Sequence, residues 1–278
     1  MSLLFDLEKV VNRFLALTNN SELWAKALQA ITLHMFSGYA INCFQQFGLD
    51  SILTSTLEEI KETKIELSLD LSPLEGMSLI DIWYVLRERD FICPTPSKET
   101  FKAYLEDLLL KKGEIKYAWL LGEMAYIIGL DVRQEYLKRD YRFFKEHLSN
   151  IDYTYWLTHK FLLGTKYLQC PLPSFGFTSV TTELVNTVEW IIKEGSLDLA
   201  AEAAICLSLS QKTNSLEYKS LIKMIVDNIN EDGTVIDPLL EDTPYSIAHT
   251  TAAAMITLAA TIDYPNLLSP SGYGLRHQ

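Results

Sequence analysis

Apolar residues recur every three or four positions along nearly the whole of this 278-residue chain, which is the spacing of one α-helix face. The first such stripe consists of Leu3, Leu4, Leu7, Val10, Val11, Phe14 and Leu15. The same period predicts further helices over 21–47, with a break near Gly38, and over 51–63, 76–90, 99–111, 114–129, 133–148, 152–164, 178–193, 196–211, 215–230 and 244–262. Ser21 is expected to cap the second helix and Gly48 to end it. We therefore expect about twelve helices.

One segment departs from the helical period. Residues 64–71 alternate apolar and polar side chains and are followed by Pro73. This pattern predicts either one strand or an extended connection. Because a single strand cannot form a sheet, we expect an all-α fold.

The connections between the predicted helices are short except over 64–75, 165–177 and 231–243. No linker rich in proline, glycine and serine divides the chain. We therefore expect one helical domain over residues 1–268, followed by a mobile tail over 269–278.

The composition of the last predicted helix decides between two architectures for a set of helical hairpins. An α-solenoid is open at both ends, whereas in an α/α toroid six hairpins close into a ring. The last helix is apolar on all sides and rich in small residues, namely Ala248, Ala252, Ala253, Ala254, Ala259 and Ala260. The segment Leu197–Ala204 has a similar composition. Because such helices must be surrounded by protein, we favour the toroid, in which they would form the inner ring.

The net charge of −12 argues against binding to nucleic acid or to an anionic membrane surface. No run of about 18 apolar residues is present. The start of the chain brings in acids before any apolar run develops, so no secretory signal is expected. The four cysteines are scattered without metal-binding spacing, and Cys43 and Cys206 lie in apolar runs typical of a core. These features predict a cytoplasmic protein with reduced thiols.

Two segments of the second half of the chain share one pattern. Each places a tyrosine four residues before a histidine, as Tyr155 before His159 and as Tyr245 before His249, so that both rings lie on one helix face. In a toroid the inner helices begin at the same mouth of the central cavity. We therefore expect the two histidines to face one cavity, with both tyrosines and Trp156 in its wall.

The expected helix starts agree with this placement. Thr243 followed by Pro244 is a strong start, because threonine caps a helix and proline suits the first turn. Asp152 is the expected cap of the other helix, which would put His159 about seven residues inside it.

Three roles are open to the histidines, beside the alternative that both are hydrogen-bonded core residues. They suit a general acid and base pair, a polar anchor for a ligand, or a metal site completed by Asp152, Cys170 or Asp242. We assign His159 and His249 as catalytic. We assign ligand-binding roles to Tyr155, Trp156, Thr158, Tyr245 and Thr250. No metal ligand is assigned, because no two histidines have the close spacing of a metal motif, and the sequence names no cofactor.

The segments Leu157-Thr158-His159 and His249-Thr250-Thr251, with an acidic loop containing Asp232-Gly233 before the second, resemble the two motifs of a family of uncharacterised bacterial proteins. Its genes often lie near those of natural-product biosynthesis, and the resemblance covers residues 150–262. It implies a helical fold like the α/α toroid but no particular reaction. The family has Thr-Asp-Phe-Gly after the first motif and tyrosine before the second histidine. This chain lacks that aspartate and has Ala248 at the second position.

These observations predict a protein of bacterial specialised metabolism that binds or modifies a small molecule or a peptide in a central cavity. The alternative is a non-catalytic helical scaffold for other proteins, because the 14 tyrosines and 5 tryptophans are residue types that favour interfaces. Whether the protein is an enzyme stays open, and homodimerisation is compatible with both alternatives. Aromatic side chains that face inward would favour the first function, and an apolar outer patch the second.

Overall fold

The computed structural model describes residues 2–62, 67–91, 96–110, 115–130, 132, 141–173 and 176–267. Within these residues all regular structure is helical, and no strand is present. The prediction of an all-α fold is therefore confirmed. The tail at 269–278, residues 133–140 of one predicted helix and residues 64–66 of the alternating segment lie outside the described part.

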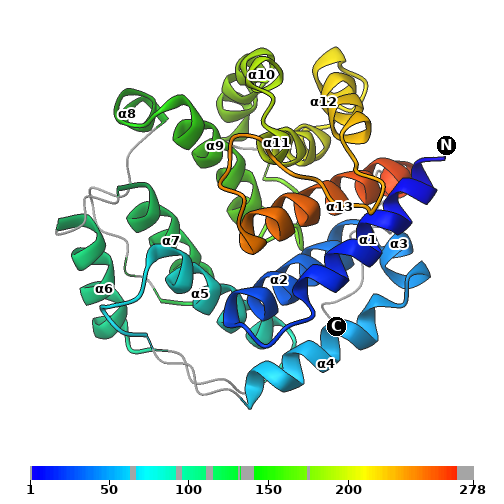
Figure 1. The fold of residues 1–278 in the computed structure, drawn as a ribbon. Coiled ribbons are helices and arrows are strands. Elements are labelled where there is room, and N and C mark those ends of the chain that lie inside the picture. The colour runs from blue at the N-terminus through cyan, green and yellow to red at the C-terminus, as the bar shows by residue number, and fades with distance from the viewer. Residues whose placement is uncertain are drawn as a thin grey trace.

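Six helices line the middle of the molecule (Figure 1), and their contacts form a closed circuit in which each touches the next and the last touches the first. They are α2 (Leu23–Tyr39), α5 (Pro73–Glu88), α7 (Ile115–Ile127), α9 (Asn150–Gly164), α11 (Leu197–Leu209) and α13 (Pro244–Leu267). The circuit joins α13, near the C-terminal end, to α2, near the N-terminal end.

A second set of helices lies outside this circuit (Figure 1), with each member packed on one or two of the inner helices. These are α1 (Leu3–Thr18), α4 (Leu49–Lys61), α6 (Lys98–Leu110), α8 (Tyr141–His147), α10 (Phe177–Glu194) and α12 (Leu216–Asp227). The short helix α3 (Ile41–Gln46) packs on α2, α4 and α13.

The helix boundaries follow local chemistry. The predicted break near Gly38 is observed at Ala40, which separates α2 from α3, and Gly48 takes a left-handed conformation (φ 63°) just before α4. Ser21 was expected to cap α2, but Glu22 occupies the cap position and makes no side-chain capping bond. Ser72, next to Pro73, forms a reciprocal capping box with Glu75 at the start of α5.

The two small-residue helices are surrounded by protein, as their composition predicts. Every residue of α11 from Leu197 to Ser208 is buried, and α13 packs against α1, α2 and α11. Within the described residues, Pro244–Asp263 is long and apolar enough to cross a membrane by composition alone. Most of it is buried inside the fold, which is typical of a core helix.

A buried carboxylate joins α13 to α3, the short helix that follows α2. Asp263 of α13 is 4% exposed and accepts hydrogen bonds from the backbone N–H groups of Asn42 (3.0 Å) and Cys43 (3.3 Å) at the start of α3. These N–H groups have no partner within their own helix, so the carboxylate of a distant helix satisfies them.

Replacing this carboxylate should therefore weaken the fold. We expect Asp263→Ala to lower the free energy of unfolding by about 1 to 3 kcal/mol, because one buried and one partly buried N–H group lose their acceptor. Urea denaturation followed by circular dichroism measures this change. The control is Asp227→Ala, which removes an exposed pair with Lys223 and should cost no more than about 0.5 kcal/mol. Equal losses in the two variants would contradict the capping role of Asp263.

Candidate functional site

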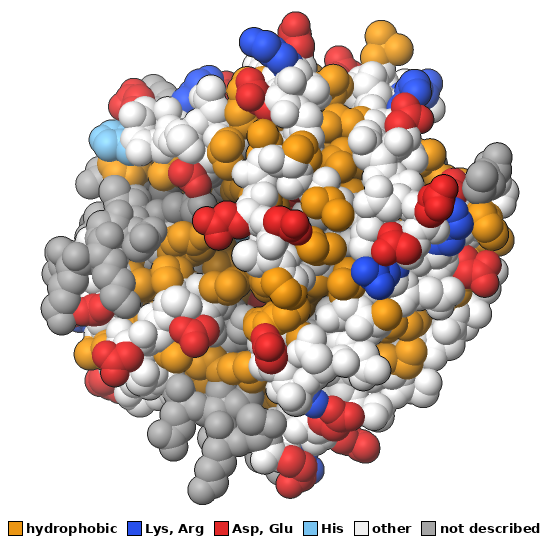
Figure 2. Space-filling view, viewed as in Figure 1, with side chains coloured by type: hydrophobic (Ala, Val, Ile, Leu, Met, Phe, Trp, Pro, Cys, Tyr) orange, Lys and Arg blue, Asp and Glu red, His pale blue; other side chains and the backbone are white. Residues whose placement is uncertain are grey.

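Two adjoining cavities lie among the inner helices. The larger has a volume of about 320 Å³ and is lined by Leu74, Met77, Tyr117, Trp119, Leu120, Ile151, Tyr155, Trp156, His159, Asp198, Leu240, Tyr245, Ser246 and His249. The smaller has a volume of about 90 Å³ and shares Met77, His159, Tyr245 and His249 with the larger. In surface view, apolar side chains gather around the middle of the face shown in Figure 2.

Both predicted histidines line both cavities, although they come from different helices. His159 lies on α9 and His249 on α13. Each ring contacts the tyrosine four residues before it, with centroids 6.2 Å apart for Tyr155 and His159 and 5.7 Å apart for Tyr245 and His249. The four-residue spacing therefore places each pair on one helix face, as predicted.

The start of α13 agrees with the sequence prediction, but the start of α9 does not. The Thr243 hydroxyl accepts the N–H of Ser246, which caps α13 just before Pro244. In α9 the cap is Ser149, whose hydroxyl accepts the N–H of Asp152, so Asp152 lies inside the helix. Serine is as good a cap as aspartate, and the prediction chose the wrong one of two nearby candidates.

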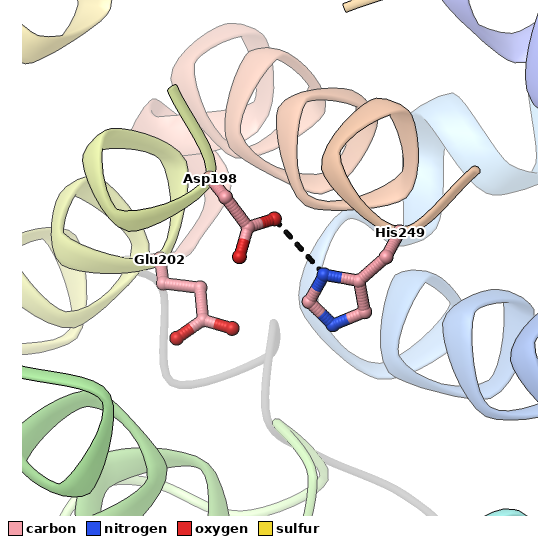
Figure 3. Close-up of side chains that lie close together, drawn as sticks. All are labelled: Asp198, Glu202 and His249. Carbon is pink, nitrogen blue, oxygen red and sulfur yellow. Dashed lines mark hydrogen bonds and ion pairs between the residues drawn. The ribbon is translucent and has the colours of Figure 1, made fainter. Parts of the chain in front are cut away.

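Two carboxylates from α11 meet His249 at the boundary of the two cavities (Figure 3). Asp198 and Glu202 are four residues apart, so they share one face of α11. Asp198 is fully buried and Glu202 is 5% exposed. One ligand-type atom from each of Asp198, Glu202 and His249 lies within 4.8 Å of the other two.

Asp198 is held by hydrogen bonds from two neighbouring helices. Its Oδ2 accepts the hydroxyl of Tyr155 from α9 at 2.7 Å. Its Oδ1 accepts Nδ1–H of His249 at 2.9 Å and the hydroxyl of Thr250 at 3.1 Å, both from α13. Burial opposes its ionisation, but the charge of His249 and these hydrogen bonds lower the pKa of Asp198 below its usual value.

Glu202 has a weaker set of partners. Its Oε2 accepts the hydroxyl of Thr158, and the same oxygen lies 3.7 Å from Nδ1 of His159. Burial raises the pKa of Glu202, and the charge of Asp198 raises it further, while the charge of His159 acts in the opposite direction.

A hydrogen bond sets the tautomer of His159, and nearby carboxylates act on the charge of His249. Nδ1 of His159 lies 2.8 Å from the backbone oxygen of Tyr155, and because a carbonyl only accepts, this nitrogen carries the proton. In its neutral form His159 therefore has an unprotonated Nε2. Burial lowers the pKa of His249, but the carboxylates of Asp198, Glu202 and Asp81 outweigh burial and raise it to about 9.

A third carboxylate faces the smaller cavity. Asp81 of α5 lines this cavity and accepts the hydroxyl of Tyr167 at 3.0 Å. Burial raises the pKa of Asp81 to about 7, even though the hydrogen bond from Tyr167 and the charge of His249 lower it.

Aromatic side chains form much of the wall of the larger cavity. Trp156 is 2% exposed and packs between Trp119 and Tyr153, with ring centroids 5.6 and 5.9 Å away. The ammonium group of Lys160 lies over the rings of Trp119 (5.1 Å) and Trp156 (5.6 Å). These contacts hold the two tryptophan rings together on this side of the cavity.

The residues with predicted ligand-binding roles occupy two kinds of position. Tyr155, Trp156 and Tyr245 line the larger cavity. Thr158 and Thr250 are fully buried and line neither cavity. Each threonine instead donates a hydrogen bond to a carboxylate of α11, so its contact with the site is indirect.

The acids and thiol that the sequence offered as metal ligands do not join the histidines. Within the described residues, the group of metal-ligand type contains Asp198 and Glu202, and neither Asp152, Cys170 nor Asp242 belongs to it. Asp152 accepts the hydroxyl of Ser149 at 2.8 Å. Sequence analysis missed the two carboxylates of α11, although an acid pair at four-residue spacing in an otherwise apolar helix was a usable signal.

The acidic loop before α13 has a structural role at the site. Asp237 Oδ2 accepts the hydroxyl of Ser196 at 2.7 Å and the N–H of Asp198 at 2.8 Å, and thereby caps α11. Asp232 accepts the N–H and hydroxyl of Thr234 within the loop itself. The loop therefore fixes the start of α11, from which Asp198 projects.

Comparison with known proteins supplies no relative: no family model, no curated protein sequence and no solved structure matches this chain.

The raised pKa of Asp81 predicts a pH dependence of stability. In the folded protein Asp81 keeps its proton up to about pH 7, whereas its ordinary value of 3.8 applies in the unfolded chain. The folded state then binds more protons between these values, so this group makes stability fall as pH rises through the window. We expect Asp81→Asn, which cannot ionise, to gain on the order of 1 to 3 kcal/mol over the parent between about pH 5 and about pH 8.

Thermal and urea unfolding of the two proteins at both pH values measures this difference. Asparagine keeps an oxygen that accepts the hydroxyl of Tyr167, so the hydrogen bond is conserved in the variant. The control is Asp70→Asn, because Asp70 is exposed and its replacement should leave the pH profile unchanged. A stability difference between Asp81→Asn and the parent that is constant with pH would disprove the prediction.

Proposed function

We propose that this protein binds a small molecule or a peptide side chain in the cavity of about 320 Å³ and acts on it through His159 and His249. The observation that carries the proposal is that two histidines from different helices line one cavity beside two buried carboxylates. Core histidines that serve only packing have no reason to meet in this way. Ionisable groups with strongly shifted pKa values in a pocket are typical of functional sites.

The protonation states suit proton transfer. The raised pKa of His249 keeps it protonated at neutral pH, so it serves as a general acid or as a positive anchor. His159 donates Nδ1–H to the backbone oxygen of Tyr155, so its Nε2 is the atom that can accept a proton. One donor and one acceptor beside the same cavity are the arrangement that acid–base catalysis requires.

The walls indicate the class of ligand. Tyr117, Trp119, Tyr155, Trp156 and Tyr245 surround a volume at the lower end of the range for small-molecule pockets. Such walls favour an apolar or aromatic group, with a polar end directed to the histidines.

We also propose that the fold is the six-hairpin α/α toroid. The closed circuit of inner contacts and the outer set of helices support a ring rather than an open solenoid. A role in bacterial specialised metabolism rests on the resemblance of the two histidine motifs alone. A cytoplasmic location is supported by Cys43, Cys170 and Cys206, none of which is in a disulfide.

The scaffold alternative has weaker support. Trp156 and Tyr245 face the cavity, which is the orientation expected of a ligand-binding protein. The most exposed large apolar side chain, Leu216 at 79%, stands at the start of α12, whereas Phe5 and Tyr126 lie on α1 and α7. Within the described residues, the exposed apolar side chains are thus distributed over several helices.

The proposal predicts that the protein purified from its native host retains a small molecule that depends on the histidines. Native mass spectrometry before and after denaturation detects such a compound. We expect titration of the recovered compound to show a dissociation constant about ten to a hundred times higher for His159→Ala and for His249→Ala. A lost hydrogen bond to a charged or polar ligand group is worth roughly 1.5 to 3 kcal/mol.

The matched control is His147→Ala. His147 makes the same bond from Nδ1 to the backbone oxygen four residues earlier, at 2.7 Å, but it is exposed on α8. Its replacement should change neither the retained compound nor the affinity. A protein that retains no compound, or that binds it equally in all three variants, would rule out the proposed site.

A further inference from the structure

We propose that Asp198, Glu202 and His249 form the binding site of one divalent transition-metal ion of the zinc type, with His159 as the nearest additional donor. The inference concerns the site described above, and the idea that the ion faces the ligand rests on the proposed function. With the ion bound, His249 is a metal ligand and no longer the proton donor of that function. Binding of the ion itself is independent of any ligand.

The donor atoms are already close to metal-binding geometry. One atom from each of the three side chains lies within 4.8 Å of the other two, and binding of the ion releases the proton that His249 shares with Asp198. Metal–ligand bonds of about 2.0 to 2.2 Å place neighbouring donors of one ion roughly 3.4 Å apart. Side-chain movements on the order of 1 Å therefore bring the three donors to this spacing.

One donor is open. Glu202 is 5% exposed and lines the smaller cavity, and its Oε2 has Thr158 and His159 as partners. Its Oε1 has no hydrogen-bond partner among the described residues. This oxygen is therefore available to a ligand, and Figure 3 shows the carboxylate of Glu202 near Asp198 and His249.

The charges of the site also favour the binding of a cation. Asp198 and Glu202 place two carboxylates beside His249, so a divalent ion that displaces the proton of this ring balances both charges. Within the described residues, every ion pair made by a lysine or an arginine is with some other acid. Buried charges require compensation, and a divalent ion supplies it at the point where the carboxylates converge.

The donor types indicate which ion binds. Two carboxylate oxygens with an imidazole nitrogen suit Zn²⁺ and related transition-metal ions, whereas Mg²⁺ and Ca²⁺ prefer oxygen ligands alone. His159 is prepared for the same role, since Nδ1–H bonds to the oxygen of Tyr155 and leaves Nε2 for a metal. Metal-binding histidines usually donate their other N–H to a backbone oxygen or a carboxylate in this way.

The test is a titration of the full-length protein with ZnCl₂ after dialysis against a chelator. Isothermal calorimetry gives affinity and stoichiometry, and elemental analysis after desalting gives the retained metal. We expect one zinc ion per chain and a higher melting temperature in its presence. Glu202→Gln keeps the acceptor for Thr158 but loses the charge, and should bind zinc at least about ten to a hundred times more weakly.

Asp198→Asn and His249→Gln should show the same loss, and circular dichroism checks that each variant is folded. If Asp198→Asn fails to fold, Glu202→Gln still decides the question. The control is Glu183→Gln on α10, whose carboxylate pairs with Lys145 at 2.7 Å, away from the cluster. This control should bind zinc as the parent does.

The outcomes separate this inference from the proposed function. One tightly bound zinc ion that is lost in Glu202→Gln supports the metal site, whether or not a small molecule is also retained. Substoichiometric zinc, or equal affinity in the parent and Glu202→Gln, overturns it. In that case a retained compound that depends on His159 would leave the proposed function standing.

Discussion

The buried carboxylate of Asp198 is the interaction on which the site depends. It stands on α11 and accepts hydrogen bonds from Tyr155 of α9 and from His249 and Thr250 of α13. Three inner helices therefore converge on one side chain. A buried carboxylate is stable only when its oxygens accept hydrogen bonds. Any displacement of α9 or α13 would break these hydrogen bonds, and their loss costs more in a buried site than in water. The positions of the cavity residues follow from this requirement.

The backbone of Asp198 is held in turn by a loop residue that caps its helix. Asp237, from the loop before α13, accepts the N–H of Asp198 and the hydroxyl of Ser196, so this loop caps α11. The segment that leads into the His249 helix thus also sets the start of the helix that carries the carboxylates. Loop, cap and buried acid form one connected unit, which couples the geometry of the site to that of the fold.

Polar groups at this density inside a helical core have an energetic cost. Burial removes water from the carboxylates of Asp81, Asp198 and Glu202. An alanine or a leucine at the same positions would pack without that cost. The two acids of α11 lie within a helix that is buried from Leu197 to Ser208. These acids therefore lower the stability that the same fold could reach with apolar residues at their positions.

The sequence by itself determined the helical class, most helix positions, the burial of α11 and α13, and the pairing of each histidine with a tyrosine. All of these depend on neighbours within about four residues, where periodicity and capping operate. The sequence did not identify Ser149 as the cap of α9, nor did it reveal that Asp198, Glu202 and Asp81 would join the histidines. Only the tertiary structure decided these partners, because α5, α9, α11 and α13 meet through contacts between residues far apart in the chain. Such contacts depend on the packing of whole helices, which no local pattern encodes.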